Sequence, residues 1–186
     1  MKVNLIKDSL LKATDYNNYR NLIKTLIIEG KSTGPNQTKD LLQYSILNDK
    51  RMDRLDKKMQ LSEDTKTSLQ QLKKKYTFLV ISEGWCGDAA QILPILNKVA
   101  EGSQHIDLKI VLRDENEELM NQFLTNGGKS IPKVIILDEE KNVINSWGPR
   151  PLIATKMVVD YKEKHGVLDD NFKKDLQIWY NKDKGE

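Results

Sequence analysis

The hydrophobic pattern changes at residue 76, and this change constrains the fold more than any other feature of the sequence. Residues 76–82 and 132–137 carry runs of apolar side chains of strand length, as in strands that are buried on both faces. From residue 76 onward the pattern predicts the order strand, helix, strand, helix, strand, strand, helix. An α/β domain is therefore expected. The predicted strands are 76–82, 106–112, 132–137 and 143–147, and the predicted helices are 91–101, 115–125 and 152–164.

The part of the chain before residue 76 is predicted to be helical. Asp15 precedes apolar residues at helical spacing, and Ser62 is placed to cap a later helix that carries Lys73–Lys75 in its last turn. We therefore divide the chain into a helical N-terminal extension, residues 1–75, packed on the core, and a domain of residues 76–186. That domain ends in an extra helix, which carries Phe172, Leu176 and Trp179 on one side.

Charge is distributed unevenly between these two parts. Residues 1–75 carry 16 Lys and Arg against 9 Asp and Glu, whereas residues 76–186 carry 14 against 18. The basic residues alternate with acidic ones, as over residues 49–58, and no stacking aromatics lie between them. This mixture predicts a solvated helix face, or a surface that docks on the acidic part, and it disfavours a nucleic-acid interface.

The hydropathy of the sequence disfavours a membrane protein. Mean hydropathy is −0.60, and the longest apolar runs have the length of a strand, far below the roughly 20 residues that span a bilayer. Lys7 and Asp8 interrupt the first apolar residues before a secretory signal can develop. We therefore expect a cytoplasmic protein without a membrane partner.

Cysteine content restricts the available chemistry further. Cys86 is the single cysteine, so no disulfide can form within the chain and no zinc-binding cysteine pair exists. His105 and His165 lie far apart in the sequence and are expected to be surface or packing residues. No metal site and no cofactor are predicted.

The segment Trp85-Cys86-Gly87-Asp88-Ala89 lies between a predicted buried strand and a helix. Unpaired N–H groups at a helix start stabilise an anion, which lowers the pKa of a thiol from its free value of ~8.5. Trp85 is placed to shield the sulfur on one side while leaving it partly open. Asp88 has two interpretations: a carboxylate that suits the first turn of the helix, or a charge that raises the Cys86 pKa.

A second candidate segment, Ile131-Pro132, opens a predicted strand. Proline has no N–H to donate to a sheet, so it belongs at a strand start or edge. Lys133 is expected to be a solvated lysine at the strand end, and contact with the sulfur or with an anionic thiol ligand is the alternative. Arg150 is expected to belong to a strand exit, or to bind a carboxylate.

These features together resemble the thioredoxin superfamily over roughly residues 76–165. The resemblance rests on the order of elements, on Trp85-Cys86-Gly87 at the first strand–helix junction, on Pro94, and on Ile131-Pro132 before the hairpin. It implies a three-layer α/β/α fold around a central mixed sheet. It also implies that Pro132 is cis and lies against the thiol, and that the backbone before it pairs with an extended substrate peptide.

The helical extension adds a narrower resemblance. Thr33-Gly34-Pro35, Asn48-x-x-Arg51-Met52-x-Arg54 and Trp-Cys-Gly-Asp-Ala are similar to a bacterial subgroup of thioredoxin-like proteins with a helical extension and a single-cysteine motif.

Three positions depart from the family's pattern. Ala89 stands in place of the second cysteine, and Asp88 in place of the usual proline. Val80 replaces the buried carboxylate that accepts a proton from the second cysteine. Cys86 can form a mixed disulfide, but no other thiol of this chain can release the product. Its pKa is expected to be lowered by less than in a dithiol relative with proline at position 88.

The first functional hypothesis is single-cysteine (monothiol) thiol–disulfide exchange through Cys86, which makes the protein a possible oxidoreductase. The resolving thiol must come from outside, so the expected partners are a low-molecular-weight thiol such as glutathione, or a protein disulfide or mixed disulfide. The predicted supporting and substrate-binding residues are Trp85, Gly87, Asp88, Ile131 and Pro132.

Other functions stay open at this point. A redox-inactive binding module would hold an extended peptide or protein partner at Pro132, or dock a partner through the basic extension. Iron–sulfur binding by a dimer, through Cys86 and an external thiol, is a third hypothesis. A one-cysteine peroxidase is disfavoured, because peroxide-reducing relatives place a threonine where this chain has Glu83.

Overall fold

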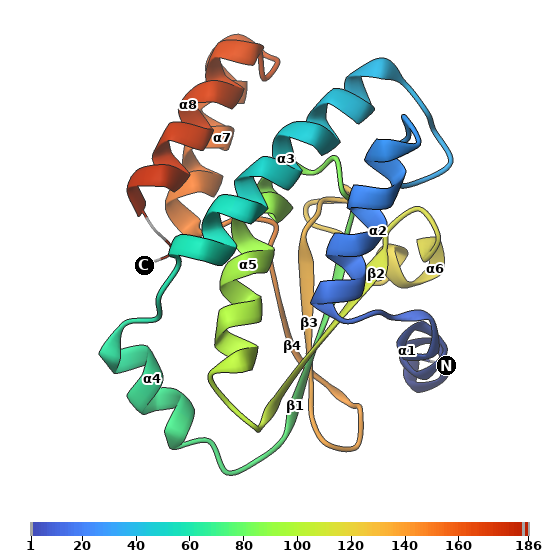
Figure 1. Ribbon diagram of the computed structural model, residues 1–186, viewed down its shortest axis with the longest axis vertical. Coiled ribbons are helices and arrows are strands. Elements are labelled where there is room, and N and C mark those ends of the chain that lie inside the picture. The colour runs from blue at the N-terminus through green and yellow to red at the C-terminus, as the bar shows by residue number, and fades with distance from the viewer. Residues whose placement is uncertain (1, 184, 186) are drawn as a thin grey trace.

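The structure, a computed structural model, describes residues 2–183 and 185 and is built around a four-stranded sheet (Figure 1). The strand order is β2-β1-β3-β4. β1 is parallel to β2 and antiparallel to β3, and β4 is antiparallel to β3. The predicted α/β class with a mixed sheet is therefore confirmed. The strands are β1 (Tyr76–Ser82), β2 (Ile106–Leu112), β3 (Lys133–Leu137) and β4 (Val143–Trp147).

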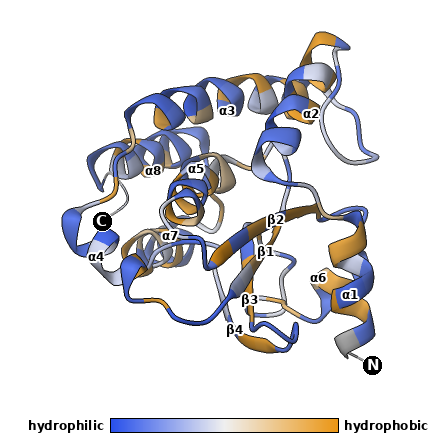
Figure 2. Ribbon diagram, turned by 60° about the horizontal axis from the view of Figure 1, so that its bottom comes forward, coloured by the Kyte–Doolittle hydropathy of each residue, from blue (hydrophilic) through white to orange (hydrophobic). Residues whose placement is uncertain are grey.

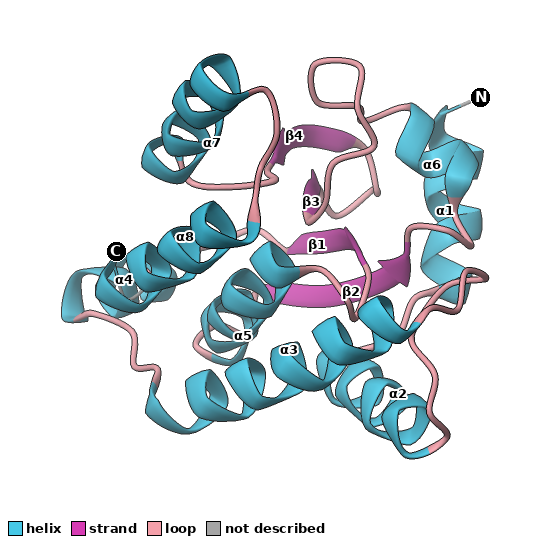
Figure 3. Ribbon diagram, turned by 90° about the horizontal axis from the view of Figure 1, so that it is seen from above, coloured by secondary structure: helices cyan, strands magenta, loops and turns pink. Residues whose placement is uncertain are grey.

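Helices cover both faces of this sheet. Viewed from above, α5, α7 and α8 lie on one side of the strands and α1 and α6 on the other, which makes the three expected layers (Figure 3). None of the helices in the described part is long and apolar enough to cross a membrane. The helices are α1 (Lys2–Lys12), α2 (Tyr16–Ile28), α3 (Lys39–Lys58), α4 (Glu63–Gln70), α5 (Gly87–Glu101), α6 (Glu117–Asn121), α7 (Leu152–His165) and α8 (Asp170–Asp183).

β1 lies in the centre of the sheet and directs the chain to the candidate site. Leu79, Val80 and Ile81 have no exposed surface, because β2 and β3 flank the strand and helices cover both faces. Figure 2 shows largely hydrophobic strands, whereas the outer helices α3 and α4 are mainly hydrophilic. The buried end of β1 leads at Ser82 into the loop that carries Cys86, so the core holds the start of that loop in place.

The helical extension packs on this core through α2 and α3. α3 lies along α5, and α2 contacts both α3 and β2 (Figure 1). The division of the chain after residue 75 stays a prediction.

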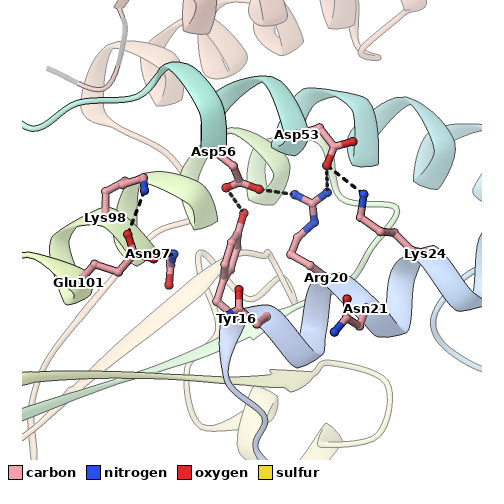
Figure 4. Close-up of a pocket in the computed structure, with 10 residues that line it drawn as sticks. Tyr16, Arg20, Asn21, Lys24, Asp53, Asp56, Asn97, Lys98 and Glu101 are labelled. Carbon is pink, nitrogen blue, oxygen red and sulfur yellow. Dashed lines mark hydrogen bonds and ion pairs between the residues drawn. The ribbon is translucent and has the colours of Figure 1, made fainter.

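A buried arginine joins the two extension helices. Arg20 of α2 is 5% exposed, and its Nη2 lies 2.6 Å from Asp49 and 2.8 Å from Asp53, while its Nη1 lies 2.8 Å from Asp56. Arg20, Asp53 and Asp56 line a polar pocket of about 330 Å³ (Figure 4). The Tyr16 hydroxyl, which also lines it, donates a hydrogen bond to Asp56. In the segment 49–58, where acidic and basic residues alternate, the acidic residues Asp49, Asp53 and Asp56 therefore face α2.

Several predicted boundaries were shifted in the structure. α1 had no predicted counterpart, and the helix expected over residues 115–125 is limited to the five residues of α6. Ser62 caps α4 as expected, with its hydroxyl accepting from the Thr65 N–H at 3.2 Å. However, α4 ends at Gln70, so Lys73–Lys75 lie beyond the helix and not in its last turn.

We predict that Arg20→Met destabilises the fold by about 3 kcal/mol, because it removes the buried cation shared by three carboxylates. Lys24, whose side chain is 42% exposed, pairs with Asp49 and Asp53 but not with Asp56. Urea unfolding followed by circular dichroism measures this loss. Lys31→Ala is the matched control, since it removes a pair with Glu29 in which both side chains are about half exposed. The control should change stability by no more than about 0.5 kcal/mol. Equal effects of the two variants would contradict a structural role for Arg20.

Candidate functional site

Cys86 ends the loop after β1 and is the N-cap residue of α5. It is 8% exposed, and its Sγ lies 3.3 Å from the carbonyl oxygen of Ile131, to which it donates a hydrogen bond. The Ile131–Pro132 peptide bond is cis. The two segments selected from the sequence, 45 residues apart, are therefore in direct contact.

The environment of Cys86 disfavours its thiolate. Burial is the largest cause and the negative charge of Asp88 the second, and together they raise the pKa of the thiol to about 12. The N–H groups of Ala89 and Asp88 lower the pKa, as a helix start should, but by less than burial raises it. The expectation of a partly open thiol with a lowered pKa is therefore wrong, because burial and the charge of Asp88 outweigh the N–H groups of the helix start.

Asp88 lies in the first turn of α5 and is a buried carboxylate with two partners. Its Oδ2 lies 2.6 Å from Arg150 Nη2, and its Oδ1 accepts a hydrogen bond from the Tyr180 hydroxyl at 2.9 Å. Burial raises the pKa of Asp88, whereas Arg150 opposes this rise. Both interpretations of Asp88 describe its position in the structure: it lies in the first turn, and its charge acts on Cys86. Arg150 binds the carboxylate of Asp88, as in the second of its two predicted roles.

The helical extension holds the loop that precedes Cys86. Both backbone polar groups of the buried Gly84 bind side chains of the extension: its N–H donates to Thr33 Oγ1 at 2.9 Å, and its carbonyl accepts from Asn48 Nδ2 at 3.0 Å. Arg51 Nη1 in turn donates to Asn48 Oδ1 at 2.8 Å. These residues belong to motifs noted in the sequence, where no pattern indicated that they meet the cysteine loop.

Trp85 lies beside the thiol and is half-buried. The guanidinium of Arg113 lies over its ring, 4.8 Å from the centroid, and Arg113 Nε donates to Asp114 Oδ1 at 2.8 Å. A cation over an indole ring is attracted to its face, so this contact holds the tryptophan at the rim of the site.

Two buried polar groups near the loop were not among the predicted site residues. Glu83 has no exposed surface, and its Oε1 accepts a hydrogen bond from the Asp114 N–H at 3.0 Å. Burial raises the pKa of Glu83. Tyr19, from α2, is 1% exposed, and its hydroxyl lies 3.1 Å from Ser82 Oγ. An amphipathic helix pattern indicates only that Tyr19 faces the core, so its hydroxyl contact needed the tertiary structure.

Lys133 is buried, so the expectation of a solvated lysine at the strand end is wrong. Its Nζ donates to Thr125 Oγ1 at 2.7 Å and lies 3.5 Å from the Gly148 carbonyl oxygen. Burial lowers its pKa. The segment after β4 also covers Pro132, since a Cβ on Gly148 would clash with the Pro132 carbonyl oxygen. Glycine at φ +116° is required for this approach.

The described residues show no arrangement for a metal ion. No group of three or more His, Cys, Asp or Glu side chains in residues 2–183 and 185 is placed to hold one. The three carboxylates around Arg20 are already occupied by that cation.

A cysteine at the start of a helix, packed against the residue before a cis proline that leads into an inner strand of a mixed sheet, defines a thioredoxin-like site. The family model described as "Thioredoxin" matches residues 34–165, which is more than half of the chain, so the protein belongs to the thioredoxin family. This match begins within the helical extension and ends at the last residue of α7.

Two solved structures are similar to this chain at 22% identity. One is a protein of unknown function from Pseudomonas aeruginosa, with 81% of this chain and 88% of that chain covered and a TM-score of 0.49. The other is an HIV epitope-scaffold, with 90% and 99% covered and a TM-score of 0.51, and this likeness supports the fold alone. No curated protein matches the sequence.

We predict that Asp88→Asn lowers the pKa of Cys86, because it removes the negative charge next to the sulfur and leaves Arg150 uncompensated. The alkylation rate of Cys86 by iodoacetamide at pH 8 should rise about tenfold for each unit by which the pKa falls. Asp107→Asn, at the opposite end of the sheet, is the control and should leave the rate unchanged. An unchanged rate in Asp88→Asn would show that the carboxylate does not act on the thiol.

Proposed function

We propose that this protein is a thioredoxin-fold binding module that holds a partner protein at the surface around Cys86 and Pro132. The state of the thiol is the observation that carries this proposal. Cys86 is buried, donates its S–H to Ile131 and has a pKa raised to about 12. Burial and the charge of Asp88 thus favour the protonated thiol at neutral pH, whereas the thiolate is the form that attacks disulfides.

The half-buried residues around the buried Cys86, called the rim here, form the proposed binding surface. Trp85, Gly87, Ser130 and Gly148 are half-buried, whereas Cys86 and its neighbours Ile131 and Pro132 are buried. Tryptophan and arginine carry much of the affinity in protein interfaces, and the Trp85–Arg113 pair supports this role. Because the Ile131 carbonyl already accepts the thiol proton, we propose that a partner segment pairs with Ser130 and the rim.

The narrower family membership belongs to the same proposal. We place the chain in the bacterial subgroup with a helical extension and a Trp-Cys-Gly-Asp-Ala motif. The contacts of Thr33 and Asn48 with Gly84 support this placement, because residues of both extension motifs bind the backbone of the cysteine loop.

Monothiol exchange through Cys86 is the second candidate, and one observation favours it. The N–H groups of Asp88 and Ala89 and the charge of Arg150 act on the sulfur and stabilise its anion. If a partner opened the loop, the thiolate would attack a disulfide, form a mixed disulfide and expel the other sulfur as a thiolate. An external thiol would then release Cys86.

We predict that Cys86 reacts slowly at neutral pH and that its titration midpoint lies above the free-thiol value of ~8.5. The alkylation rate with iodoacetamide from pH 4 to 11, read by intact mass, measures this midpoint, with Cys86→Ser as the blank. The same protein should not remove glutathione from a glutathionylated peptide. A midpoint below ~8.5 together with rapid release of glutathione would establish exchange and contradict the binding proposal.

We predict that Cys86→Ser retains peptide binding, whereas Trp85→Ala weakens it by about tenfold or more. The probe is a displayed library of random nine-residue peptides, from which the wild-type protein selects ligands whose affinities are then measured by calorimetry. Tyr44→Ala, which removes an exposed aromatic residue of α3, is the control and should bind as the wild type does. Loss of binding in Cys86→Ser, or selection of no ligand by the wild type, would contradict the proposal.

A further inference from the structure

Two donor groups from different helices converge over Gly87, the residue that follows the cysteine. A Cβ placed on Gly87 would lie 3.5 Å from Arg51 Nη1 of α3 and 3.4 Å from Gln177 Nε2 of α8. A Cβ there would make ordinary van der Waals contacts with these two groups, so they lie directly beside the backbone of Gly87. Gly87 itself is half-buried.

Neither donor group is used up within the described residues 2–183 and 185. Arg51 donates from Nη1 to Asn48 Oδ1, but no carboxylate of this part of the chain lies within ion-pair distance of it. Gln177 accepts a hydrogen bond from Gln91 Nε2 through its Oε1 at 2.8 Å, and its Nε2 has no acceptor there. Arg51 and Gln177 therefore present free N–H groups on the same side of Gly87.

The local charge balance favours a negative ligand. Burial is the largest cause of a lowered Arg51 pKa, and the neighbouring cation Arg54 is the second. Asp88 attracts Arg51, but its two oxygens are already bound to Arg150 and Tyr180. A half-buried cation that repels its neighbour and lacks its own carboxylate gains most from an incoming anion.

We infer that Arg51 and Gln177 form a carboxylate-binding subsite over Gly87, which takes an acidic side chain of the partner segment held at Cys86. This inference rests on the proposed function. A carboxylate suits the subsite because a planar guanidinium and a carboxamide both donate hydrogen bonds to oxygen, and hydrogen bonds to an anion are the stronger kind. The neutral thiol of Cys86 is compatible with an anion nearby, whereas a thiolate would repel it.

Selection from the random peptide library tests the subsite. The wild-type protein should enrich Asp or Glu at one peptide position, and replacement of that residue by Asn or Gln should weaken binding by about tenfold or more. Arg51→Gln should abolish this preference. Lys50→Gln, which removes an exposed cation of the same helix, should retain it.

Gly87→Ala separates a steric effect from a charge effect. The added Cβ makes ordinary contacts at 3.4–3.5 Å, and no positive φ disfavours alanine there, so the fold should be retained. The methyl group nevertheless occupies the space over residue 87, and the preference for an acidic residue should disappear while both donor groups remain. An acidic preference that survives in Arg51→Gln or Gly87→Ala would overturn the subsite.

A small probe distinguishes failure of this subsite from failure of the proposed function. N-acetyl-glutamate should shift the Gly87 amide and the Gln177 side-chain amide in NMR spectra of the full chain, and N-acetyl-glutamine should not. Peptides bound without any acidic preference would leave the binding module standing and overturn the subsite. If N-acetyl-glutamate shifts these signals but the protein binds no peptide, the binding module is overturned, and with it the inference that an acidic side chain of a partner occupies the subsite.

Discussion

The buried carboxylate of Asp88 is the constraint on which the rest of the site depends. A charge that loses its water must be paired, and the two partners of Asp88 come from different places: Arg150 from the segment between β4 and α7, and Tyr180 from α8. Its position two residues after Cys86 ties the state of the thiol to these contacts. The position of the segment after β4, the position of α8 and the protonation of the sulfur therefore all depend on Asp88.

Much of this fold could be predicted from the sequence, because hydrophobic periodicity is a local signal. The strand order along the chain and the cap at Ser62 were expected from the pattern, and the proximity of Pro132 to the thiol from the family resemblance. The structure places the carbonyl of Ile131, the residue before that proline, against the sulfur. The resemblance carried the long-range part of this prediction. No local pattern could have brought together two segments that are 45 residues apart in the chain.

The errors share a physical cause, which is that burial depends on what the rest of the chain places over a residue. A lysine after a strand-opening proline is ordinarily solvated, but Lys133 is covered and satisfied by Thr125. Cys86 was expected to gain from the helix start, and its N–H neighbours do stabilise the anion. The burial of the sulfur against Ile131 and the charge of Asp88 outweigh this stabilisation of the thiolate, because a buried anion loses its hydration.

The buried charge of Asp88 explains why the site involves an element outside the matched segment. The family match covers residues 34–165, yet Tyr180 lies in α8, beyond its end. A proline at position 88 would require neither Arg150 nor Tyr180, because it carries no charge. Asp88 gives α8 a polar contact in the buried interior, and the same helix brings Gln177 to Gly87. The chain has Ala89 and no second thiol, and the donor groups of Arg51 and Gln177 lie beside Cys86, so both features agree with the proposed binding role.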